Sequence, residues 1–167
     1  MKAKLIINNQ ELEVEISEEE YKKLQPVEKK TGYERVDEGD TYYYGSYRGG
    51  VEYDRDERCP WDDEPYNIAN YYSSKEVAEN NARADKLMRQ LRRFAVEHRE
   101  KELDYQNRMG LSFIGYGIDG EDLIVLNIGW SKCFGNIYFD SPEAAQLAID
   151  TFHDELIWYF TEYKDSL

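Results

Sequence analysis

The chain has 167 residues and a formal net charge of −14, so it is long enough for a domain with a real core and carries a strongly negative field. This field excludes non-specific attraction to DNA or anionic lipid for the molecule as a whole and favours a basic partner. Hydrophobic residues reach only 41% while aromatic residues reach 14%, with 15 Tyr, so burial must rely on aromatic rings.

The N-terminal segment has the pattern of a small β module. Residues 3–16 alternate apolar and polar side chains around a polar turn, which predicts a β-hairpin. Ser17 begins a capping-box pattern for a short helix that Pro26 ends. We therefore expect an N-terminal module over residues 1–30 and a compact α+β domain over residues 31–167.

The next segment is rich in tyrosine and then in carboxylates. Residues 33–53 have strand-like patterns separated by glycine-containing turns, and predict two or three aromatic strands. Residues 54–66 contain two prolines, many acidic residues and almost no apolar periodicity. This composition predicts a solvated acidic loop.

Two long helices are predicted from apolar stripes at three- and four-residue spacing, one over about residues 75–99 and one over about residues 142–163. Between them, residues 111–118 and 123–130 read as strands joined by a tight turn, and residues 136–139 as a third strand. The domain thus divides into a first part over residues 31–100 and a second part, a three-stranded sheet with a helix, over residues 101–167.

A short pattern at residues 71–78 returns at residues 138–145, with an aromatic pair, then Ser, then an early Glu. Each copy predicts a strand that leads into a capped helix, with the cap at Ser74 and Ser141 or at the residue just before each. The predicted fold class is therefore α+β: antiparallel sheets, one long amphipathic central helix, a C-terminal helix packed on a sheet, and a strand-to-helix unit repeated twice.

The acidic, tyrosine-rich segment is the candidate partner-binding surface. Aromatic side chains beside carboxylates suit a protein interface, although tyrosines spaced along strands also suit core packing. The residues that we assign to this surface are Tyr43, Tyr47, Asp54, Asp56, Glu57, Trp61, Asp62, Asp63 and Glu64.

The central helix has a basic face, with more basic than acidic residues over residues 83–101. Two interpretations stay open: a solvated face that pairs with the carboxylates of the same molecule, or an anion-binding surface. The residues of the second interpretation are Arg83, Arg89, Arg92 and Arg93.

We expect no catalytic residues, no cofactor and no metal site, because the chain lacks motifs for nucleophilic or metal-assisted chemistry at the required spacing. No apolar run is long enough to cross a membrane and no signal peptide is evident, so we expect a cytoplasmic protein without membrane contact. The oligomeric state is left open.

Three parts of the chain carry a recognisable pattern: TGYERVDEGDTYYY at residues 31–44, YNIANYYSSKEVAE at residues 66–79 with LRRFA at residues 91–95, and FGNIYFDSPEAA at residues 134–145. Together they resemble a family of small uncharacterised phage and prophage proteins of Firmicutes. Ala69, where the family pattern has Gly, and the Cys-Pro-Trp sequence of the acidic segment depart from the resemblance. It implies a phage context in the host cytoplasm and supplies no reaction.

In that context the leading hypothesis is a non-enzymatic accessory protein: an anti-defence, anti-CRISPR-like inhibitor whose acidic surface imitates DNA and occupies a basic nucleic-acid-binding channel of a host protein. The alternative is a nucleotide-binding protein, such as a signal sponge, that uses Tyr and Arg side chains. Direct nucleic-acid binding through residues 83–101 would have to overcome the global charge and is not expected.

Overall fold

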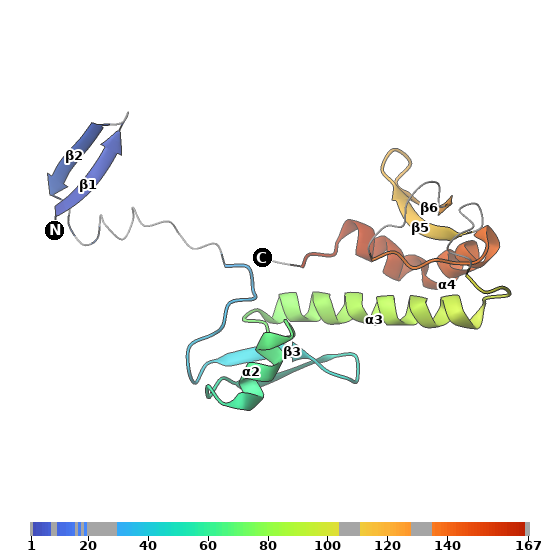
Figure 1. Ribbon diagram of the computed structural model, residues 1–167, viewed down its shortest axis with the longest axis horizontal. Coiled ribbons are helices and arrows are strands. Elements are labelled where there is room, and N and C mark those ends of the chain that lie inside the picture. Colours follow the sequence, from blue (N-terminus) through green and yellow to red (C-terminus); the bar gives the residue numbers. More distant parts are fainter. Residues whose placement is uncertain are drawn as a thin grey trace. The chain divides into compact units, whose positions relative to one another are not determined.

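The computed structural model describes residues 2–7, 10–15, 17, 19, 30–103, 111–127 and 135–165. The chain forms two compact units, Met1–Lys30 and Thr31–Leu167. Figure 1 shows the helices and strands of both units.

The first unit contains an antiparallel hairpin of β1 (Lys2–Ile7) and β2 (Gln10–Glu15). The register places Leu5 opposite Leu12. This confirms the hairpin predicted over residues 3–16. The short helix predicted to follow it lies outside the described residues.

The second unit begins with a hairpin of β3 (Thr41–Gly45) and β4 (Val51–Arg55). The connection closes with a hydrogen bond of 2.8 Å from Ser46 N to Gly50 O, and Gly49 adopts a φ of 84°, in the left-handed region. The tyrosine-rich segment therefore forms two strands, whereas residues 33–36 are not part of a strand.

The predicted acidic loop is wrong for its second half, because α2 (Pro60–Asn67) forms there. Its start is built from local signals: Cys59 is the N-cap, Pro60 occupies a first-turn position, and the Asp62 carboxylate accepts a hydrogen bond of 3.1 Å from the Cys59 N–H. The helix is short and has little apolar periodicity, so its stability depends on contacts with the rest of the unit.

The central helix α3 (Lys75–Glu97) confirms the predicted long helix. Ser74 caps it, since its Oγ accepts a hydrogen bond of 3.4 Å from the Val77 N–H. One stripe of the helix is buried, as the three- and four-residue spacing predicted. The buried residues are Val77, Ala78, Ala84, Leu87, Leu91 and Phe94.

The second unit contains another hairpin, of β5 (Ser112–Gly117) and β6 (Asp122–Asn127). We call β3–β4 the first hairpin of this unit and β5–β6 the second hairpin. The predicted tight turn through residues 119 and 120 is instead a four-residue turn over residues 118–121, in which Glu121 adopts a φ of 49°. The predicted helix at the C-terminal end is confirmed as α4 (Pro142–Thr161), capped by Ser141 and interrupted by non-helical angles at Phe152.

The repeated sequence pattern corresponds to a repeated structural unit. In the first copy Tyr72 forms an antiparallel bridge with Tyr43 of β3, and in the second Phe139 forms one with Ser112 of β5. Each bridging residue stands two positions before the serine cap of the following helix. The third strand predicted over residues 136–139 is therefore a single bridge, because only one residue of the segment pairs with β5.

Two hydrophobic clusters lie along α3, which is placed between the β3–β4 hairpin and α4 (Figure 1). Near its start, Val77 and Ala78 pack with Tyr72, and the half-buried Tyr43 and Val51 of the first hairpin cover them. Further along, α3 packs against α4, and α4 contacts both strands of the second hairpin. This larger cluster contains Leu87, Leu91, Phe94, Leu123, Phe139, Ala145, Ala148, Ile149 and Leu156.

Candidate binding surface on the first hairpin and α2

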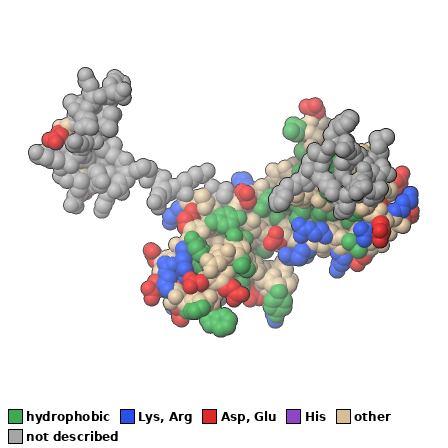
Figure 2. Space-filling view, in the orientation of Figure 1, with side chains coloured by type: hydrophobic (Ala, Val, Ile, Leu, Met, Phe, Trp, Pro, Cys, Tyr) green, Lys and Arg blue, Asp and Glu red, His purple; other side chains and the backbone are tan. Residues whose placement is uncertain are grey.

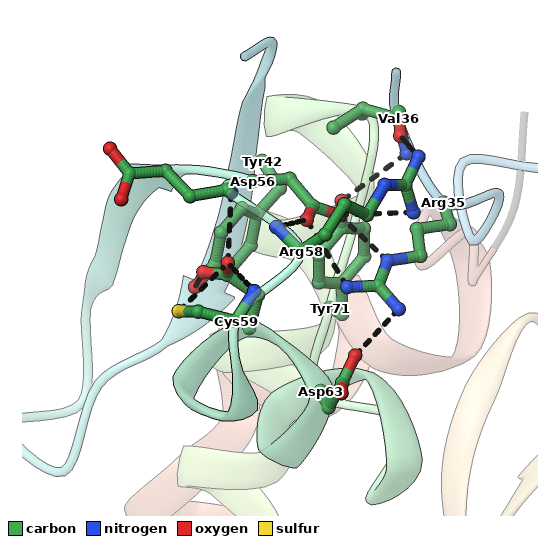
Figure 3. A network of polar contacts seen from close by, with 10 residues as sticks. Arg35, Val36, Tyr42, Asp56, Arg58, Cys59, Asp63 and Tyr71 are labelled. Carbon is green, nitrogen blue, oxygen red and sulfur yellow. Dashed lines mark hydrogen bonds and ion pairs between the residues drawn. The ribbon is translucent and has the colours of Figure 1, made fainter. Parts of the chain in front are cut away.

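The acidic segment is held in place by a buried carboxylate, Asp56, whose side chain is fully buried. Its oxygens accept hydrogen bonds from Arg35 Nε (2.7 Å), Arg35 Nη2 (3.1 Å), Tyr71 Oη (2.8 Å) and Arg58 N (2.9 Å). Figure 3 shows these groups converging on the carboxylate, with Asp63 on the far side of Arg35. Asp56, which directly follows β4, is thus joined to the segment before α3 through Tyr71 and to Asp63 of α2 through Arg35.

The electrostatics of Asp56 follow from these contacts. The hydrogen bonds from Arg35, joined by those from Arg58 N and Tyr71, hold the pKa of the carboxyl well below its usual range and outweigh the opposing effect of burial. The carboxylates of Asp56 and Asp63 both accept hydrogen bonds from Arg35. They raise the pKa of the Arg35 guanidinium, Asp56 by more than Asp63. The pair is therefore ionised, and its charges satisfy each other.

Asp62 is the second buried carboxylate, and it organises the start of α2. It accepts hydrogen bonds from Tyr42 Oη (3.2 Å), Glu57 N (2.9 Å), and the N and Sγ of Cys59. Burial raises the pKa of Asp62, but the donors, led by those of Cys59, lower it by more. Among the described residues, no buried side-chain nitrogen or oxygen lacks a hydrogen-bond partner.

Tyrosine rings fill the space between the two carboxylates. Tyr42 stacks on Tyr71 with ring centroids 4.3 Å apart and an angle of 10° between the ring planes. Tyr66 meets Tyr71 edge to face, and the Arg35 guanidinium lies over the Tyr66 ring. Burial and the Asp56 carboxylate raise the pKa of Tyr71 to about 12.

These contacts correct two of the predicted partner-binding residues. Asp56 and Asp62 do not face solvent, because their charges are used to hold the segment together. Asp63 is half-buried and paired with Arg35 at 2.7 Å. Asp54, Glu57 and Glu64 are exposed, as the prediction requires.

The aromatic residues of the predicted surface also divide into two groups. Tyr47 is 89% exposed at the end of the hairpin and Trp61 is 77% exposed on α2. Tyr43 is half-buried and packs toward α3, so it belongs to the core. Tyr53, which was not among the residues assigned to the predicted surface, is 74% exposed on β4.

We call the exposed residues of this region the acidic–aromatic surface. Figure 2 shows hydrophobic side chains beside acidic and basic ones at the surface of the second unit. The acidic–aromatic surface consists of Tyr47, Glu52, Tyr53, Asp54, Glu57, Trp61 and Glu64.

The basic face of α3 is largely paired within the molecule. Arg83 donates to Glu155 on α4 at 2.8 Å, and its guanidinium lies 3.9 Å from the centre of the Trp158 ring. Arg89 and Arg93 form longer ion pairs with acidic residues one turn away on α3, at 4.0 and 3.7 Å. Of the predicted arginines, Arg92 is exposed without an ion pair to a described residue.

Arg35 and Tyr71 are the residues that sequence reasoning missed. Arg35 stands as a basic residue just before an acidic stretch, and Tyr71 stands three residues before the Ser74 helix cap, so neither has a local pattern that predicts its contact with Asp56. The signal was the excess of carboxylates itself, because so many acids near one another require some cationic partners.

No helix among the described residues is long and apolar enough to cross a membrane. Within the same ranges, no three His, Cys, Asp or Glu side chains are grouped so that they could hold a metal ion. Comparisons with protein-family models, with curated proteins and with solved structures found no match.

Proposed function

We propose that this chain is a non-enzymatic phage or prophage accessory protein that inhibits a host defence system in the host cytoplasm, in the manner of an anti-CRISPR protein. Its acidic–aromatic surface would bind a basic nucleic-acid-binding surface of a host protein. The observation that carries the proposal is a hydrogen-bonded frame, built on Asp56 and Asp62, beside which exposed aromatic rings and exposed carboxylates lie together.

Both chemical components suit a protein partner. Exposed Tyr and Trp side chains supply large contact areas at low conformational cost and are enriched among the residues that dominate binding energy. Exposed carboxylates on β4 and α2 provide a complementary field for a basic channel and accelerate encounter. The net charge of −14 extends that field over the molecule.

The frame also reduces the entropy lost on binding. An acidic loop that became ordered only in the complex would lose conformational entropy at that moment, which weakens affinity. Here Arg35 joins Asp56 to Asp63, so β4 and α2 are fixed to each other before any partner arrives. The acidic–aromatic surface is therefore preorganised.

Capture of a partner from a host that carries defence systems tests the proposal. The tagged full chain is expected to retain a host nucleic-acid-binding protein and to restore growth of a phage that the defence restricts. Capturing none, together with failure to restore growth, would sink the proposal.

Charge-reversal variants distinguish binding through the acidic–aromatic surface from attraction by the net charge of the molecule. The double variant Asp54→Lys, Glu57→Lys changes two exposed carboxylates of the acidic–aromatic surface and is expected to lose capture. A matched control makes the same change at Asp150 and Glu143, which are exposed on α4. Equal loss in both variants would show that the overall charge, and not this surface, attracts the partner.

A second candidate function is nucleotide binding. A groove of about 490 Å³ between the first hairpin and α3 is lined by Tyr47, Tyr72 and Arg89, which suit stacking and phosphate contact. The Asp85 carboxylate also lines this groove and would repel a phosphate, so we rank this function second. Thermal shift with cyclic and linear nucleotides tests it, because a tight ligand must raise the melting temperature.

A further inference from the structure

β4 is the edge strand of the first hairpin, and its outer side is not paired with any strand among the described residues. The bonding pattern shows which backbone groups face outward. Ser46 N donates to Gly50 O at one end of the hairpin, and Asp56 N donates to Asp40 O at the other. Hydrogen-bonded and non-hydrogen-bonded residue pairs alternate along an antiparallel hairpin, so the even-numbered residues between these ends are the ones that bond across it. The N–H and C=O groups of Val51, Tyr53 and Arg55 must then point away from β3. The Arg55 N–H already donates to Asp54 Oδ1 at 2.8 Å, so it is not available to a further strand.

The other side of the hairpin supports this assignment independently. Tyr43 exchanges two backbone hydrogen bonds of 2.9 Å with Tyr72, so its polar groups also point away from β4. Since Tyr43 stands opposite Tyr53, the two residues form a pair without hydrogen bonds between them. Tyr53 is therefore at the middle of an open edge with free donors and acceptors.

The edge is accessible. Every residue of β4 after Val51 is exposed, and Tyr53 is exposed over 74% of its surface. At the Val51 end the edge borders a groove of about 530 Å³, whose other walls come from α3 and α4 and carry two cations, Arg83 and Lys86, and two carboxylates, Glu79 and Glu155. An extended chain has room to lie beside β4 there.

The side chains of β4 indicate which chain would fit. Glu52 and Asp54 lie on one face of the strand, where Glu52 accepts a hydrogen bond of 3.3 Å from Tyr44 Oη. Tyr53 lies on the opposite face with Val51. A strand added here gains most if its residues alternate between cationic side chains on the first face and aromatic or β-branched ones on the second.

We propose that β4 receives an extended basic segment of the partner protein as an additional strand. This inference rests on the proposed function and adds the mode of binding: backbone hydrogen bonds to Val51, to Tyr53 and to the Arg55 carbonyl provide affinity, and the carboxylates on one face select cationic side chains.

Charge argues against a second copy of the chain as the occupant. If two β4 strands paired antiparallel about Tyr53, Glu52 of one copy would stand opposite Asp54 of the other, twice. Like charges directly opposite each other destabilise a sheet. The same two carboxylates favour a cationic strand.

Synthetic peptides with alternating Lys and Val test strand addition, with calorimetry on the full chain as the readout. Backbone N-methylation of one alternate set of residues removes the N–H groups that would face β4, while methylation of the other set removes only groups that face solvent. We expect binding to be lost for one methylated peptide and retained for the other. If both bind as well as the unmodified peptide, charge alone explains the attraction and strand addition is overturned.

A matched pair of variants tests the same point in the protein. Tyr53→Pro removes an outward N–H without removing a hydrogen bond of the hairpin, a position at which strands tolerate proline. Tyr53→Thr loses the ring but keeps the N–H. We expect binding to fall roughly tenfold for Tyr53→Pro, a loss near the upper end for one hydrogen bond, and by less for Tyr53→Thr. Circular dichroism and melting confirm that each variant is folded; a folded Tyr53→Pro that binds like Tyr53→Thr contradicts the proposal.

Failure of this inference is distinguishable from failure of the proposed function. If the host protein is captured equally by the wild type and by Tyr53→Pro, the function stands and strand addition is wrong. If the peptide binds but no phage is rescued, strand addition stands and the anti-defence role is wrong. Sedimentation that finds a dimer, dissociated by Tyr53→Pro, would assign the edge to a second copy and overturn the inference.

Discussion

The substitution Asp56→Asn removes one negative charge from the centre of the polar network while keeping the volume of the side chain. The wild-type carboxylate is fully buried and accepts hydrogen bonds from Arg35, Tyr71 and Arg58 N. The amide presents an NH2 group where a donor is already present, so at least one contact of Arg35 is lost. Breaking a buried ion pair costs about 3–5 kcal/mol, and we expect about 3 kcal/mol because Arg35 keeps its bond to Asp63.

The assay is thermal or urea unfolding of the full chain at neutral pH. A loss of about 3 kcal/mol lowers the melting temperature of a chain of this size by roughly 6–12 °C. The control is Asp54→Asn, which removes the same charge from an exposed position two residues away and should change stability by less than about 0.5 kcal/mol. If the two variants unfold together, Asp56 does not hold the acidic segment and the reasoning is refuted.

The lowered pKa of Asp56 also predicts how the stability of the wild type changes with pH. The pKa of Asp56 is lowered in the folded state, so its contribution is complete above the pKa of an unfolded Asp, about 3.9, and is lost as the pH falls toward the folded value. The stability difference between the wild type and Asp56→Asn should therefore be constant from neutral pH down to about pH 5. It should then shrink in more acid solution.

Three further predictions concern stability. Gly32→Ala should destabilise the protein by more than Gly39→Ala in urea unfolding: both glycines have a φ near 90°, which costs roughly 1–2 kcal/mol for alanine, but only at Gly32 does the added Cβ meet Val77, at 2.7 Å. Ser141→Ala should cost about 1 kcal/mol through loss of the α4 cap, measured in the same way. The pKa of Tyr71 is raised to about 12 in the folded protein, so stability should fall as the pH rises from about 10 through 12, and should fall by less in Tyr71→Phe. An identical loss of stability at alkaline pH in both proteins would contradict the assigned contacts.

Features with local signals were predictable from the sequence. Alternation predicted the hairpin of residues 3–16, and apolar stripes with serine caps predicted α3 and α4. The two copies of the aromatic–Ser pattern predicted equivalent junctions, and Tyr72 and Phe139 form equivalent bridges. The α+β fold class followed from these elements.

The candidate site was predictable only in part, because its geometry depends on contacts distant in the sequence. Asp54 and Asp56 are the same residue type, two positions apart in one acidic segment, so the sequence does not distinguish them. Asp54 is nevertheless exposed, whereas Asp56 is buried and bonded to Arg35 and Tyr71. The same non-local contacts stabilise α2, whose eight residues carry too little periodicity to predict a helix. The third predicted strand is only a single bridge at Phe139, again because of a non-local contact: the length of a strand depends on how many of its residues pair with the neighbouring strand.

Hydrogen exchange on the complex with the captured host protein tests the central claim most directly. We predict that binding protects the amides of Val51 and Tyr53 and those of the exposed turn of α2 around Trp61, while the amide of Asp54 changes little because the hairpin already protects it. Protection confined to the basic face of α3, with residues 51–64 unchanged, would contradict the account.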